Sequence, residues 1–172
     1  MDVKVVDYQD SWTEEYNLEK NSLQLRLQEQ LIRCFHIGST SIKGLRAKPV
    51  IDLLLIVKDL EYLDRLSQQM KIDGYEVMGE FGIRGRRYFR KGGAERTHHI
   101  HAFKFDNITE IVRHIAFRDY LQENKERRQQ YSALKSHLAS QYPYDIKRYI
   151  DGKNALIKDI EREALIWYWL DR

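Results

Sequence analysis

The chain has 172 residues, of which 42% are hydrophobic and 32% are charged, so we expect a single globular domain over residues 1–172 with no disordered tract. The net charge of +3 is too small to favour nucleic acid as a partner, and no apolar run approaches the ~20 residues that cross a bilayer. These features predict a cytoplasmic protein with no membrane partner, and none of them indicates an oligomeric state. The single cysteine, Cys34, excludes an internal disulfide and is expected to be a buried, inert thiol.

The first half of the chain mixes helical and strand patterns. Apolar residues recur at helical spacing from Trp12 to Ile32, which predicts a long helix that could contain one break. Residues 33–37 form a short apolar strand pattern, and residues 49–57 form a second one with apolar residues on both faces. A strand buried on both faces should lie inside the sheet. Residues 60–72 then read as a helix that ends at the Asp73-Gly74 turn.

The second half begins with strands and ends with helices. Strand patterns at 75–77, 87–90 and 98–105 are joined by glycine-containing turns, which favours an antiparallel meander. Helical periodicity returns over 108–124, 125–141 and 144–170, and Gly152 marks a point where the last helix could break. We therefore expect an α+β fold, with a mixed sheet flanked by helices and a helical C-terminal part.

The most informative segment runs from His36 to Asp52. A strand that ends in Gly38-Ser39 allows backbone N–H groups and hydroxyls to approach a phosphate closely, because glycine has no Cβ. Asp52 lies inside an apolar strand, where an acid is costly to bury unless it is paired or binds a metal. Its alternative role is an acid bonded to backbone or to a basic neighbour. The residues expected to contact the phosphates here are Gly38, Ser39, Thr40, Ser41 and Lys48.

This Gly-Ser…Asp pattern resembles the nucleotidyltransferase superfamily signature, and the fuller run from His36 to Asp52 resembles the GrpB family. The resemblance continues nearly to the end of the chain, through residues 79–80, 85–89, 98–101, 113–121, 131 and 134–135. It implies a nucleotidyltransferase-like mixed sheet and a site for a nucleoside triphosphate. In active nucleotidyltransferases a second acid follows the first by two positions, and that position here is Leu54. The resemblance therefore leaves two-metal chemistry in doubt.

Other side chains could complete the site. His99 and His101 alternate onto one face of a strand and, with Asp52 and Glu80, could bind one divalent metal (Mg²⁺, Mn²⁺ or Zn²⁺). In that arrangement Asp52, Glu80 and His101 would be the catalytic groups, whereas the alternative is that the histidines only bridge strands. Arg87 suits outer phosphates, and Lys135, Tyr149 and Lys153 could approach from the helices, although a solvated helix face is the alternative for each.

Two functions from different classes follow. The first is a nucleotidyltransferase that moves a nucleotidyl or phosphoryl group to an acceptor. The second is a binding module for a nucleotide or other phosphate ligand, in which Leu54 marks the loss of catalysis. An RNA-binding domain that uses the basic segment around Arg84 is a third interpretation, and the low net charge disfavours it.

Overall fold

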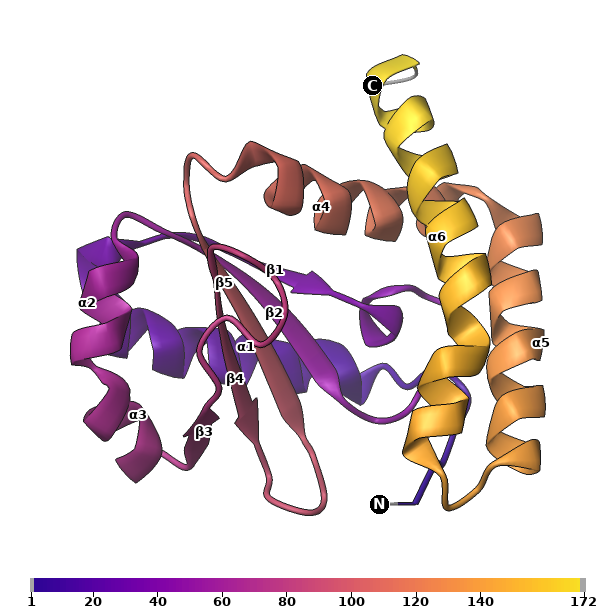
Figure 1. The fold of residues 1–172 in the computed structure, drawn as a ribbon, viewed down its shortest axis with the longest axis horizontal. Helices are drawn as coiled ribbons and strands as arrows, with labels where there is room; N and C mark the ends of the chain where they lie inside the picture. Colours follow the sequence, from indigo (N-terminus) through magenta and orange to yellow (C-terminus); the bar gives the residue numbers. More distant parts are fainter. Residues whose placement is uncertain (1, 171–172) are drawn as a thin grey trace.

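Five strands form one mixed sheet in the order β1-β2-β5-β4-β3 (Figure 1). The computed structural model describes residues 2–170. β2 and β5 are parallel, while the other neighbouring strands are antiparallel, so β3, β4 and β5 form the expected meander. The strands are β1 (Leu31–Ile37), β2 (Ile51–Val57), β3 (Tyr75–Val77), β4 (Arg86–Lys91) and β5 (His98–Lys104). The predicted α+β class with a mixed sheet is confirmed.

Six α-helices surround the sheet within the described residues: α1 (Ser11–Leu27), α2 (Leu60–Arg65), α3 (Ser67–Ile72), α4 (Ile108–Glu123), α5 (Lys125–Gln141) and α6 (Ile146–Leu170). Short 3-10 turns are η1 (Gln28–Gln30) and η2 (Ser39–Ser41). None of the helices in residues 2–170 is both long and apolar enough to cross a membrane.

The structure differs from the predicted helices at the end of the first and inside the second, and the last has no break at Gly152. The first helix ends at Leu27 because Gln28 turns with φ of 50°, and the last apolar residues of the predicted helix belong to β1. The predicted 60–72 helix is interrupted at Leu66. α6 runs through Gly152 without a break. This glycine allows α5 to pack closely, because a Cβ at position 152 would lie 2.6 Å from Leu138 Cδ2.

The two faces of the sheet are covered differently (Figure 1). α1, α2 and α3 supply apolar residues to one face, where Leu53 and Leu55 of β2 are fully buried. On the other face, Leu54 packs against Phe103 of β5 and Ile111 of α4. Strand side chains alternate, so Asp52 projects on the same side as Leu54. α5 and α6 lie beside this second face, and a cavity remains between them and the start of β2.

The β1–β2 connection is held against the helices. Ile42 and Leu45 are fully buried in a cluster with Tyr131 of α5 and Ile160 of α6. Arg118 of α4 donates from Nη1 to the backbone oxygen of His36, at 3.2 Å, which ties α4 to the end of β1. Burial raises the pKa of the Cys34 thiol on β1 to about 11, as expected for an inert thiol.

Candidate functional site

A cavity of about 340 Å³ lies between the start of β2 and β5 and helices α4, α5 and α6. Its size is within the range of pockets that bind small molecules. The polar and aromatic residues that line it are Gly38, Ser39, Lys48, Asp52, His99, His101, Arg113, His114, Phe117, Tyr131, Lys135, Tyr149, Lys153 and Glu161. Ile37, Ala47, Val50, Ile150 and Ile157 supply the apolar part of the wall.

Asp52 lies beside two histidines of the neighbouring strand. β2 and β5 are parallel with Asp52 opposite His99, so strand alternation places His99 and His101 on the Asp52 face. Their ring nitrogens, Nδ1 of His99 and Nε2 of His101, lie 3.4 Å and 3.1 Å from Asp52 Oδ1. Burial opposes ionisation of Asp52, but the contacts with His101 and His99 outweigh it and lower the pKa of the carboxyl. Asp52 is therefore an ionised carboxylate in the wall of the cavity.

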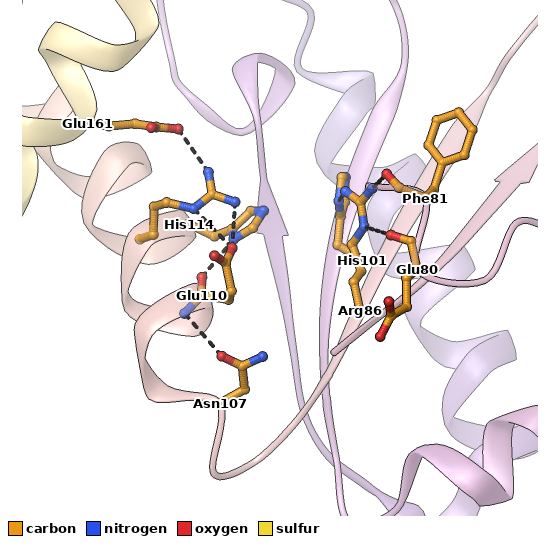
Figure 2. Close-up of polar contacts among 9 residues, drawn as sticks. Glu80, Phe81, Arg86, His101, Asn107, Glu110, His114 and Glu161 are labelled. Carbon is orange, nitrogen blue, oxygen red and sulfur yellow. Dashed lines mark hydrogen bonds and ion pairs between the residues drawn. The ribbon is translucent and has the colours of Figure 1, made fainter. Parts of the chain in front are cut away.

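The tautomer of His101 is set by Arg86, which is buried. Arg86 Nη1 lies 3.3 Å from His101 Nδ1, and the guanidinium also donates to the backbone oxygens of Glu80 and Phe81 (Figure 2). A guanidinium only donates, so Nδ1 must accept and Nε2 carries the proton that points to Asp52. Burial lowers the pKa of His101, in agreement with a neutral ring. His101 is thus a donor to Asp52.

Gly38 allows the chain to pass close to Asp52. Its φ is +70°, and a Cβ at this position would lie 2.6 Å from Asp52 Oδ2. Any other residue would meet both backbone strain and a collision with the carboxylate. The close approach in the structure is to Asp52, whereas the approach to a phosphate that the sequence predicts at Gly38 stays a prediction.

The three hydroxyls after Gly38 have different surroundings. Ser39 lines the cavity, and its Oγ accepts a hydrogen bond from Lys135 Nζ at 2.9 Å. Thr40 is 1% exposed, and its hydroxyl lies between His36 Nε2 and the Val50 oxygen. Ser41 Oγ donates to the Gly38 oxygen at 2.6 Å. Only Ser39 is thus brought to the cavity, while Thr40 and Ser41 hold the turn.

Lys48, Lys135 and Lys153 converge on the cavity from the β1–β2 connection, α5 and α6. Lys135 is 2% exposed, and burial, with the nearby charge of Lys153, lowers its pKa to about 6. Burial, with the charge of Lys48, lowers the pKa of Lys153 to about 8, and burial lowers that of Lys48. Among residues 2–170, no carboxylate lies within 4.0 Å of these three amines. They form a group of one buried and two partly buried amines that make no close ion pair, although the charge of Asp52, in the same cavity, partly offsets the effect of burial on Lys48 and Lys153.

Tyrosine rings provide partial compensation for these lysines. Lys135 Nζ lies 4.3 Å from the centre of the Tyr131 ring. Lys153 and Lys48 both lie over the Tyr149 ring, at 4.4 Å and 5.7 Å. Such cation–π contacts are worth about 0.5–2 kcal/mol, well below the cost of burying an ammonium group. The lysine charges are therefore only partly compensated, and a bound anion would stabilise them further.

The far side of the cavity contains residues that the sequence did not single out as functional. Arg113 and His114 of α4 and Glu161 of α6 line it. Arg113 bonds Glu110 at 2.7 Å and Glu161 at 2.8 Å. His114 Nδ1 lies 2.7 Å from the backbone oxygen of Glu110 (Figure 2). One sequence signal could have indicated this wall: Tyr149, Lys153, Ile157 and Glu161 recur every four residues and so share one helix face.

The described residues do not present a metal centre of the predicted composition. Leu54, at the position of a second acid, is fully buried in an apolar cluster. Glu80 lies in the turn before β4, where its Oε1 accepts from the Gly85 N–H, and it does not line the cavity. In residues 2–170, no group of three or more His, Cys, Asp or Glu side chains is arranged to hold a metal ion. Asp52 alone does not fit a two-metal centre.

Arg87 also lies away from the cavity. It points to the opposite face of the sheet, where its guanidinium forms a two-bond ion pair with Asp64 of α2, at 2.6 Å and 2.9 Å. The neighbouring Arg86 instead faces His101. Only one of two adjacent strand residues can lie on the His101 side of the sheet, and that residue is Arg86 rather than the predicted Arg87. Arg86 contacts His101 but does not line the cavity.

The family model and the related proteins found by comparison point to one family. Residues 2–163 match the family model described as GrpB protein. UPF0157 protein YqkA of Bacillus subtilis (strain 168) is 44% identical over 165 residues, which is 96% of this chain but only 48% of that protein. The chain thus spans about half the length of that relative. Glutamate-rich protein GrpB of Alkalihalophilus pseudofirmus is 31% identical over 94% of this chain and 95% of its own length.

Solved structures show the same fold. The crystal structure of conserved protein GrpB from Enterococcus faecalis is 48% identical, covers 96% of this chain and 99% of its own, and has a TM-score of 0.93. Cid1, in complex with the UTP analogue UMPNPP, is 14% identical with a TM-score of 0.52, over 79% of this chain and 43% of its own. Terminal uridylyl transferase 4 from Trypanosoma brucei with bound dUTP has a TM-score of 0.51 at 14% identity, over 78% and 46%. At this identity the last two show likeness of fold alone.

Proposed function

This chain belongs to the GrpB family, and from that premise we propose that its cavity binds a nucleotide or another small phosphorylated ligand. The phosphates contact Lys48, Lys135 and Lys153, beside the Gly38-Ser39 turn. The observation that carries this proposal is the convergence of three amines on one cavity, none of which forms an ion pair within 4.0 Å with a carboxylate of residues 2–170.

The cost of the lysine group supports a bound anion. An ammonium group removed from water loses several kcal/mol unless an opposite charge replaces the lost hydration. Natural cores seldom contain such groups, and perturbed titratable residues in a cleft are typical of functional sites. A phosphate group supplies oxygens for several N–H donors at once. Bound phosphate would therefore restore the charged state of the lysines.

Fold likeness selects the first ligands to test. The structures of Cid1 and terminal uridylyl transferase 4 contain a UTP analogue and dUTP. A nucleoside triphosphate has enough negative charge for three lysines, and the cavity volume of about 340 Å³ suits a ligand of small-molecule size. We therefore take nucleoside triphosphates as the first ligand class.

Nucleotidyl transfer is the second candidate function. The observation that favours it is the ionised Asp52 beside the Gly38-Ser39 turn. Against it stand the buried Leu54 and the remote Glu80, which leave Asp52 without a second acid. Binding without transfer is thus the function that the geometry supports better.

Isothermal titration calorimetry with tripolyphosphate and the four ribonucleoside triphosphates tests the proposal. Each ligand is titrated with Mg²⁺ and with EDTA, into the unmodified protein and into Lys135→Met and Lys153→Met. The matched control is Lys158→Met, because Lys158 is an exposed lysine on α6. We expect binding that each cavity variant weakens about tenfold or more and that the control preserves.

Two results would contradict this proposal. One is an absence of binding for every phosphate ligand, and the other is an equal loss of affinity in the cavity variants and the surface control. Transfer is examined separately, by incubating the protein with labelled nucleotide and looking for pyrophosphate release. Pyrophosphate release that Asp52→Asn abolishes would favour the second candidate.

A further inference from the structure

The cavity extends along one face of α6 and has two chemically different ends. Tyr149, Lys153, Ile157 and Glu161 are spaced by four residues and all line it. Eight residues separate Lys153 from Glu161, which corresponds to about 12 Å of helix. Lys48 lies over the same Tyr149 ring as Lys153, so the lysines gather at one end. Arg113 of α4 bonds Glu161 and so lies at the other end, and His114, also on α4, lines the cavity as well.

His114 presents an unprotonated nitrogen at this second end. Its Nδ1 is 2.7 Å from the Glu110 backbone oxygen, which can only accept, so Nδ1 carries the hydrogen. Burial lowers the pKa of the ring to about 3, which leaves Nε2 without a proton at neutral pH. The structure gives Nε2 no hydrogen-bond partner within residues 2–170. A ring of such low basicity accepts a hydrogen bond without removing the proton.

The neighbouring arginine does not make this end cationic. Arg113 Nε and Nη2 donate to Glu110 Oε2, and Nη1 donates to Glu161 Oε1. One guanidinium is thus flanked by two carboxylates, as Figure 2 shows for Glu110 and Glu161. Arg113 is already neutralised and is not free for a phosphate.

The middle of the cavity also accepts hydrogen bonds. The centres of the His101 and His114 rings are 5.4 Å apart, so His114 adjoins the Asp52 cluster. Asp52 is ionised, and the only described donors to it, His99 and His101, both approach Oδ1. Its Oδ2 lies against Gly38, without a hydrogen bond from residues 2–170. Asp52 Oδ2 and His114 Nε2 can thus accept hydrogen bonds from a ligand, while the lysine amines at the other end can donate them.

We propose that the ligand is a phosphorylated sugar, such as the ribose part of a nucleotide, whose hydroxyl groups donate to His114 Nε2 while its phosphates contact the lysines. This inference rests on the proposed function and adds the identity of the second half of the ligand. It assigns His114 the role of a specificity-determining residue. A bare polyphosphate fills only the lysine end and gains nothing from His114.

Paired ligands and His114 variants test the inference. Affinities are measured by calorimetry for tripolyphosphate, each ribonucleoside triphosphate and its 2′,3′-dideoxy counterpart. Ribose 5-phosphate is included to distinguish a free sugar phosphate from a nucleotide. The variants are His114→Leu, which removes the acceptor, and His114→Gln, which supplies an amide oxygen. The matched control is His137→Leu, because His137 is an exposed histidine on α5.

We expect the unmodified protein to prefer a ribonucleotide over its dideoxy form by about tenfold, the effect of one unpaired buried acceptor. His114→Leu abolishes that preference and leaves tripolyphosphate affinity unchanged, while His114→Gln restores part of it. The His137 control behaves like the unmodified protein.

Each other outcome has a distinct meaning. If tripolyphosphate binds but the dideoxy forms bind as tightly as the ribonucleotides, this inference is overturned and the phosphate proposal stands. It is also overturned if His114→Leu keeps the preference or weakens tripolyphosphate binding to the same extent. If no phosphate ligand binds to the unmodified protein, both the proposed function and this inference fail.

Discussion

A buried charged side chain lies on each face of the sheet, Glu19 on one and Lys135 on the other, but only Glu19 has an oppositely charged partner within ion-pair distance. On the face covered by α1, Glu19 accepts from Lys91 Nζ at 2.9 Å and 3.0 Å and from the Tyr75 hydroxyl. On the face covered by α4, α5 and α6, Lys135 is buried to a similar degree and its Nζ bonds only the neutral Ser39 hydroxyl among the described side chains.

We interpret the paired charge as one that stabilises the fold and the unpaired charge as one that binds a ligand. A buried ion pair that loses one partner leaves the other charge uncompensated, which destabilises the native state. An unpaired buried lysine is already in that situation in the free protein. Removal of a paired charge should therefore cost stability, while removal of an unpaired one should cost binding.

The largest expected loss of stability is that of Glu19→Gln. The substitution leaves Lys91 without its acid, so we expect the free energy of unfolding to fall by about 3 kcal/mol. Urea unfolding measures this change, with Glu29→Gln, at an exposed position of η1, as the control. Phosphate binding should be preserved. A loss no greater than that of the control would remove the contrast between the two faces.

A smaller loss is expected when Gly38 is replaced by Ala. Gly38 and Gly79 both have positive φ, at 70° and 62°, but only at Gly38 would an added methyl group collide with Asp52. Gly79→Ala should cost about 1 kcal/mol from backbone strain alone. Gly38→Ala should cost about 2 kcal/mol, because the methyl group also displaces Asp52. Equal values in chemical unfolding would show that the Asp52 contact does not constrain this position.

The smallest effect on stability is expected for Lys135→Met. Methionine fills a similar volume and removes an amine whose burial is unfavourable to its charged form, so stability at pH 7 should be unchanged or higher. The same chemical unfolding experiment measures it. A loss of about 2 kcal/mol or more would mean that Lys135 is a structural group like Glu19.

Much of the fold and the centre of the site follow from local patterns. Strand alternation alone places His99 and His101 on one face, and the apolar strand around Asp52 predicts that this acid has a special partner. The Gly-Ser turn and the meander also depend on neighbours in the sequence. These features were predicted because their physical cause lies within a few residues.

The remaining errors concern packing between distant segments. Which of Arg86 and Arg87 lies on the cavity side of the sheet depends on the register of β4 against β5, in which Tyr88 is opposite His101. Glu80 is the exception, because its carboxylate bonds the Gly85 N–H within its own turn, a local contact that the sequence pattern does not reveal. His114 and Glu161 become neighbours of the cavity only when α4 and α6 pack on the sheet.

The most direct test of phosphate binding by the unpaired lysines is to count the protons taken up with the ligand. Lys135 has a lowered pKa of about 6 and Lys153 of about 8, so at pH 8 both amines are wholly or partly neutral in the free protein. A bound phosphate raises both pKa values, and the protein must then take up protons. Because protons are taken up on binding, affinity should fall as the pH rises above about 6, the pKa of the free Lys135 amine.

The measurement is calorimetric titration of a ribonucleoside triphosphate at pH 8 in Tris and in HEPES, whose ionisation enthalpies differ. The ligand phosphates are almost fully ionised at this pH, so the counted protons go to the protein. We predict uptake of about 1.5 protons per bound ligand, about one by Lys135 and about 0.5 by Lys153, so that Lys135→Met loses about two thirds of it. Binding with the same enthalpy in both buffers, or proton uptake in Lys135→Met equal to that of the unmodified protein, would contradict the assignment of these lysines as the phosphate site.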